Sequence, residues 1–63
     1  MRLQEIVAAI NNGKRVFCGN NYEVIKDSKN QYLIVCLSND YTIGLTWLDG
    51  VTLNGDESNF FIQ

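Results

Sequence analysis

The stretch Tyr32–Ser38 (YLIVCLS) constrains the fold most, because it is apolar at both odd and even positions. A strand turns alternate side chains to opposite faces, so both faces of a strand here would be apolar. A strand on the outside of a half-solvated sheet instead alternates apolar and polar residues. Residues 32–38 therefore predict a central strand.

The N-terminus carries an apolar stripe with the spacing of an α-helix, formed by Leu3, Ile6, Val7 and Ile10. Gly13 follows the last of these residues, where a helix commonly ends in a left-handed cap. Lys14 and Arg15 come next, at the negative end of the helix dipole. These features predict a helix over residues 2–12.

The turn after residues 22–26 sets the register of the first predicted hairpin. Asp27–Gln31 fits a type I turn with a bulge, in which Asp27 bonds to turn amides and Asn30 takes the left-handed position. Such a turn pairs Asp27 with Gln31. The same register places Val24 opposite Ile34 and Tyr22 opposite Cys36.

Asn39–Asp40 fits a two-residue turn, because both residue types accept positive φ. The pairs that follow are Ser38 with Tyr41, Cys36 with Ile43, Ile34 with Leu45, and Tyr32 with Trp47. The two turns agree on the face that forms the core. Its predicted members are Tyr22, Val24, Tyr32, Ile34, Cys36, Ile43, Leu45 and Trp47.

The remaining strands are short. Arg15–Cys18 precedes the first hairpin, and Asp49–Gly50 predicts a tight turn that leads to a strand over residues 51–53. A polar loop over residues 54–59 leads to Phe60–Ile62, which we expect to add an edge strand or to plug the sheet. Residues 1–63 thus predict a single α+β domain: an N-terminal helix on a twisted antiparallel meander of four to six strands, with barrel-like curling as an alternative.

The second face of the predicted sheet is apolar along its middle, where Ile25, Leu33, Val35 and Leu37 lie. Glu23 lies among these aliphatic residues. Because a carboxylate is rarely buried without a partner, we expect it to pair with a cationic side chain such as a lysine or to lie at a subunit boundary. One short helix cannot cover both faces of a sheet. Barrel closure, the C-terminal segment or another subunit could cover the second face, and we expect a homo-oligomer that buries the four aliphatic residues.

Charge and composition argue against several classes of function. The formal net charge is -2, which argues against binding to a nucleic-acid backbone. The chain has no histidine to act as a general base, and its two cysteines are too few for a structural zinc site within one chain. We therefore expect no enzyme activity, no cofactor and no metal. No apolar run reaches the length of a membrane span and no secretory signal is present, so we expect a cytoplasmic protein.

Cys18 and Cys36 fall on different predicted strands. They could form a disulfide if those strands were neighbours, but free thiols in a reducing compartment are the favoured interpretation.

Three motifs have simple structural explanations. Gly13–Lys14 lacks the other residues of a phosphate-binding loop, so it reads as a helix cap followed by a strand. An oxygen-rich cluster near the C-terminus has Val51 and Leu53 where calcium ligands are required, so it reads as solvated loops. The aromatic residues could stack bases, although core packing explains them better unless Trp47 is exposed. These aromatic residues are Tyr22, Tyr32, Tyr41 and Trp47.

The run from Leu3 to Val16 (LQEIVAAINNGKRV) resembles the opening of many small phage-encoded accessory proteins, which begin with an amphipathic helix, Gly-Lys and a strand. These proteins include a family that counters the Thoeris defence by sequestering its cyclic nucleotide signal. That family typically closes with an acidic pair and a tryptophan, whereas this chain closes with Asn59–Gln63. The resemblance implies a phage-type protein that acts in the host-cell cytoplasm, and it assigns no binding residues.

The leading functional hypothesis is a non-enzymatic protein that inhibits a host bacterial protein, such as a defence component, by binding to it. Carboxylates for steering and aromatic residues for anchoring suggest a contact surface. The candidates are Asp49, Asp56, Glu57, Phe60 and Phe61. The alternative is an oligomeric sponge for a small cyclic nucleotide, whose phosphate would contact Lys14, Arg15 and Lys26. A third hypothesis is an oligomeric structural part of a virion.

Overall fold

The helix α1 spans Leu3–Asn11 in the computed structural model, which describes all of residues 1–63. The Glu5 carboxylate accepts a hydrogen bond of 2.7 Å from the backbone N–H of Arg2 and so satisfies one free donor at the start of the helix. Gly13 ends the helix with a φ of 78°, a left-handed conformation that glycine adopts without strain. The predicted helix and its glycine cap are confirmed.

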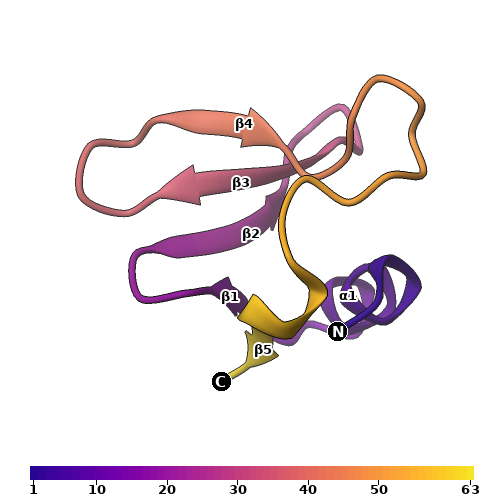
Figure 1. The fold of residues 1–63 in the computed structure, drawn as a ribbon, viewed down its shortest axis with the longest axis horizontal. Helices are drawn as coiled ribbons and strands as arrows, with labels where there is room; N and C mark the ends of the chain where they lie inside the picture. The colour runs from indigo at the N-terminus through magenta and orange to yellow at the C-terminus, as the bar shows by residue number, and fades with distance from the viewer.

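Five short strands follow the helix and form one antiparallel sheet. They are β1 (Val16–Cys18), β2 (Tyr22–Lys26), β3 (Tyr32–Cys36), β4 (Thr42–Gly44) and β5 (Phe60–Ile62), with a 3-10 turn, η1 (Glu57–Asn59), before the last strand. Their order is β4-β3-β2-β1-β5 (Figure 1). The α+β class is confirmed, and the C-terminus adds an edge strand beside β1, as expected. The sheet does not close into a barrel, because β4 and β5 lie at opposite edges.

The hairpin of β2 and β3 has the predicted register, with Val24 opposite Ile34 and Tyr22 opposite Cys36. Its turn is also the predicted one. The Asp27 carboxylate accepts hydrogen bonds of 2.8 Å from the N–H groups of Lys29 and Gln31, and Asn30 has a φ of 63°. Local turn chemistry therefore determines this register.

The register between β3 and β4 differs from the prediction by two residues: Ile43 lies opposite Ile34 instead of Cys36. The two-residue turn would need positive φ at both Asn39 and Asp40, whereas only Asp40 adopts it, at 60°. A four-residue connection forms instead, in which Cys36 donates its backbone N–H to the carbonyl of Tyr41 at 2.8 Å. A shift of two residues preserves the face of each side chain, so Ile43 stays on the predicted side.

One face of the sheet carries the core. The helix lies over β1 and β2 (Figure 1). Residues 45–59, here called the crossing segment, run from β4 across the sheet to β5 at the other edge. Cross-strand partners share a face, so the buried strand residues all project to this side. The buried residues are Ile6, Ala9, Val16, Val24, Ile34, Cys36, Leu45 and Phe60.

Three residues of the predicted core are exposed: Tyr22, Ile43 and Trp47. Tyr22 and Ile43 project to the core side, but beyond the area that α1 and the crossing segment cover. Trp47 has no partner on β3, because the shifted register places Leu45 beside Tyr32, whose carbonyl accepts the Leu45 N–H at 3.0 Å. The chain therefore leaves the sheet before Trp47.

The two cysteines are free and cannot form a disulfide in this fold. Tyr22 lies between them, opposite Cys18 on one side and Cys36 on the other. Two strand spacings separate their Cα atoms by about 10 Å, which exceeds the limit of about 7 Å for a disulfide.

Candidate interaction surfaces

Three large apolar side chains are exposed on the hairpin that follows β4: Trp47, Leu48 and Val51, here called the apolar tip. Trp47 is 64% exposed, Val51 is 73% exposed, and Leu48 is fully exposed. Exposed apolar side chains that gather on one loop mark interaction sites more often than scattered ones do. The apolar tip is a candidate contact surface that sequence reasoning placed partly in the core.

Hydrogen bonds hold the backbone of this hairpin. Thr46 and Leu53 form a β-bridge, and Trp47 donates its N–H to the carbonyl of Thr52 at 2.9 Å. A turn then closes between Gly50 and Trp47, also at 2.9 Å. A four-residue loop over residues 48–51 thus replaces the predicted two-residue turn at Asp49–Gly50, and the predicted strand over residues 51–53 does not form. Within this loop the side chains of Leu48 and Val51 are exposed to solvent.

The carboxylate of Asp49 stabilises the loop from inside. It accepts hydrogen bonds from the N–H groups of Val51 at 3.0 Å and Thr52 at 2.9 Å, and from the Thr52 hydroxyl. These bonds favour the charged form and lower the pKa of Asp49, with the Thr52 hydroxyl as the largest cause. Asp49 therefore stabilises the turn, and its hydrogen bonds fix the loop backbone that carries the apolar tip.

This hydrogen bonding predicts a pH dependence for the loop. Because the folded pKa of Asp49 lies below its usual value, the stabilisation is complete above the usual carboxyl range and is lost as the pH falls through the lower folded pKa. An NMR titration of the Asp49 carboxyl should show the lowered pKa. Thr52→Val should raise this pKa toward its usual value, and an unchanged pKa in that variant would contradict the assignment.

A groove runs beside the loop along the outer surface of α1. Its volume is about 700 Å³, and it is lined by helix residues including Leu3 and Val7 together with Val51 and Glu57. Leu3 and Val7 belong to the predicted apolar stripe of the helix, but they lie at its margin and are only half-buried. The groove and the apolar tip thus share Val51 and form one continuous candidate surface.

The other face of the sheet has no helix or loop over it. This open face is defined by five partly exposed apolar residues and one ion pair: Phe17, Ile25, Leu33, Val35, Phe61 and Arg15–Glu23. Two of the apolar residues, the rings of Phe17 and Phe61, stack with centroids 6.0 Å apart. Leu37 lies in the turn just beyond β3, at the margin of this face.

The ion pair explains the unexpected glutamate at position 23. Arg15 donates from Nε and Nη2 to the two carboxylate oxygens of Glu23, each at 3.0 Å, and its guanidinium carbon lies 5.0 Å from the centre of the Phe17 ring. The hydrogen bonds to Glu23 and its charge raise the pKa of Arg15 further. The Glu23 side chain is only 17% exposed, so the pair neutralises a carboxylate near the middle of the open face.

The structure does not gather the predicted partner-binding residues on one surface. Asp49 holds the apolar tip, whereas Asp56 caps η1 by accepting the Ser58 N–H at 3.1 Å. Glu57 lines the groove, and its carbonyl accepts a hydrogen bond from the N-terminal amine. Phe60 is buried and Phe61 lies on the open face. Only Asp49 and Glu57 lie on the combined surface of tip and groove.

The predicted phosphate-binding cations do not converge within one chain. Arg15 lies on the open face with Glu23, whereas Lys26 projects to the other face, where its Nζ donates to Asn11 at 3.1 Å and lies 5.7 Å from the centre of the Tyr32 ring. Lys14 is exposed at the end of α1. A phosphate site built from all three would need a second chain.

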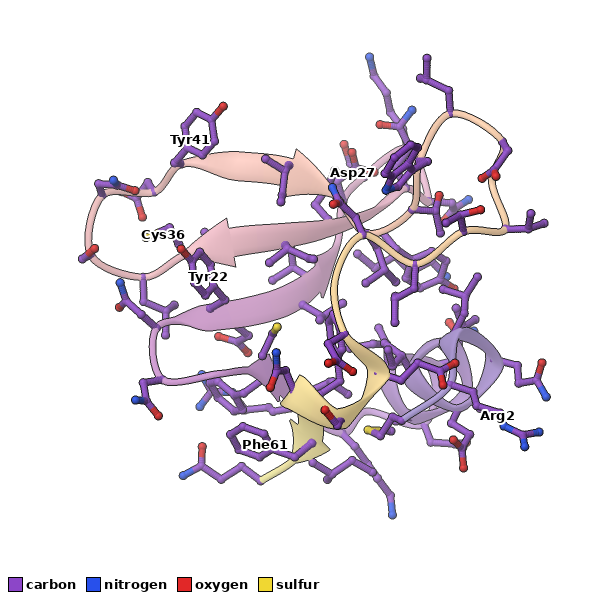
Figure 2. All side chains as sticks on the ribbon, viewed as in Figure 1. Arg2, Tyr22, Asp27, Cys36, Tyr41 and Phe61 are labelled. Carbon is purple, nitrogen blue, oxygen red and sulfur yellow. The ribbon has the colours of Figure 1, made fainter.

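The exposed aromatic residues also lie apart. Tyr41 and Tyr22 flank Cys36 at one end of the sheet (Figure 2). Trp47 follows Leu45 at the other end of β4, beside the acidic Asp49. Core packing is therefore the wrong explanation for Trp47, but the aromatic residues do not form one platform on which bases could stack.

Fold and surfaces together define a small α+β protein with two separate exposed apolar surfaces. No group of three or more histidine, cysteine or carboxylate side chains is placed to hold a metal ion. None of the helices has the length and apolar character that crossing a membrane requires. Comparison of the chain with known protein families, curated proteins and solved structures finds no match.

Proposed function

We propose that this protein is a non-enzymatic accessory protein of phage type that acts in the host-cell cytoplasm by docking on a host protein, such as a defence component, and inhibiting it. The observation that carries the proposal is the exposure of Trp47, Leu48 and Val51 on a loop held by Asp49. Tryptophan is among the residues most enriched at the energetic centres of protein interfaces.

The loop offers affinity at low entropic cost. Burying a large apolar side chain contributes about 1.5–3 kcal/mol, and three apolar side chains, Trp47, Leu48 and Val51, are exposed here. Because the carboxylate of Asp49 already fixes the backbone, the loop loses little conformational freedom when a partner binds. The neighbouring groove along α1 could receive an apolar side chain of the partner, and Asp49 and Glu57 would favour a partner with cationic groups at its rim.

A pull-down from bacterial lysate with matched variants tests this function. Wild-type protein should capture a host protein, and Trp47→Ala should reduce capture at least about tenfold, the effect of losing one central interface residue. Tyr41→Ala is the control, because Tyr41 is an equally exposed aromatic residue at the far end of the sheet. Equal capture by wild type and Trp47→Ala, or equal loss in both variants, would contradict the proposal.

A further inference from the structure

We infer that the open face of the sheet is the interface of a symmetric dimer, and that its occupant is a second copy of this chain. The inference is independent of the proposed host partner. The apolar tip and the groove are formed by α1 and the segment between β4 and β5, and neither belongs to the open face.

The residues of the open face lie in adjacent strands, and Glu23 with its partner Arg15 lies between the Phe17–Phe61 stack and Val35. Phe61, Phe17, Glu23 and Val35 are cross-strand neighbours in one row, and Leu33 and Ile25 are neighbours in the next. None of these residues is buried, and the helix packs against the opposite face. Two such sheets can pack face to face at a distance of about 10 Å, with their side chains interdigitated.

The charges on this face favour a copy of the same chain. Arg15 and Glu23 are its two charged groups, so the face is neutral although the chain carries a net charge of -2. The excess negative charge lies elsewhere, and two copies can therefore meet here without repulsion between like charges.

A two-fold axis near the ion pair would also bring opposite charges together. Arg15 uses Nε and one N–H of Nη2 for its own Glu23, so Nη1 keeps its donors for Glu23 of the partner subunit. The Arg15 side chain is well exposed and can reach outward. A closed network of two arginines and two glutamates would leave neither carboxylate unpaired in the interface.

The available area matches what a stable dimer requires. The molecule measures 26 × 23 × 23 Å, so one of its six sides supplies about a sixth of its 4412 Å² surface, or roughly 740 Å². A specific interface buries about 800 Å² per partner. The contact would thus lie at the small end of the range of specific interfaces.

Light scattering after size exclusion, with sedimentation equilibrium over a wide concentration range, tests the dimer. Wild type should approach twice the chain mass of 7.2 kDa at high concentration. Ile25→Lys places a charge on the open face and should give a monomer. Ile43→Lys is the matched control, because Ile25 is 37% and Ile43 36% exposed, but Ile43 lies opposite Ile34 on the other face and should keep the dimer.

Arg15→Ala provides a second measurement that does not depend on a lysine within the sheet. It should raise the dissociation constant at least about tenfold, since it leaves two carboxylates unpaired in the interface. Circular dichroism verifies that each variant is folded. A wild type that stays monomeric at all concentrations, a dimer that survives both Ile25→Lys and Arg15→Ala, or a dimer that Ile43→Lys abolishes would overturn the inference.

Discussion

Replacing Leu45 by alanine is expected to lower the free energy of unfolding by about 2–5 kcal/mol, the range for a buried leucine that leaves a cavity. Leu45 is 1% exposed and packs in the cluster that joins the helix to the sheet. A chain of 63 residues has a total stability of about 3–9 kcal/mol, so the substitution should remove a large fraction of it. Urea denaturation followed by circular dichroism measures the change.

Leu48→Ala is the matched control for this prediction. Both substitutions remove the same atoms from the same residue type, three positions apart, but Leu48 is fully exposed. We expect the control to change stability by less than about 0.5 kcal/mol. Equal losses in the two variants would show that Leu48 is packed and would remove the apolar tip as a surface.

Phe60→Ala is expected to destabilise the protein by about 3–5 kcal/mol, because Phe60 is buried in the core cluster and anchors β5 to the sheet. Its neighbour Phe61 projects to the open face and stacks on Phe17. Phe61→Ala should therefore cost only about 1 kcal/mol in the monomer, close to the value of one aromatic pair.

The phenylalanine pair separates folding from association. Denaturation at low concentration measures the monomer, where Phe60→Ala should show the larger loss. Sedimentation at high concentration measures association, which Phe61→Ala should weaken. If Phe61→Ala destabilised the dilute monomer as much as Phe60→Ala, the assignment of the two rings to opposite faces would be wrong.

The parts of the fold that depend on neighbouring residues were predictable from the chain. The α1 stripe, its Gly13 cap and the Asp27–Gln31 turn each rest on interactions within a few positions, and all three occur as predicted. The face of each core strand residue was also predictable, since alternation survives a register shift of two.

The candidate surfaces were less predictable, for reasons that individual residues show. Glu23 gave a signal, because it is a carboxylate among aliphatic residues, but its partner Arg15 lies just before a different strand, β1. Trp47 was assigned to the core because the turn at Asn39–Asp40 was read as two residues long. The adjacent apolar pair Trp47–Leu48 was the available sign of exposure, since neighbouring strand residues cannot both face one core.

By itself, the sequence determined a helix, its cap, the first hairpin register and the existence of two apolar sheet faces, because short-range hydrogen bonds and side-chain periodicity specify these features. Only the tertiary structure decided which face the helix covers, where the chain leaves the sheet after Leu45, and which aromatic residues remain in solvent. Those outcomes depend on the competition among distant segments for a small core, and a helix of 9 residues covers only one side of five strands.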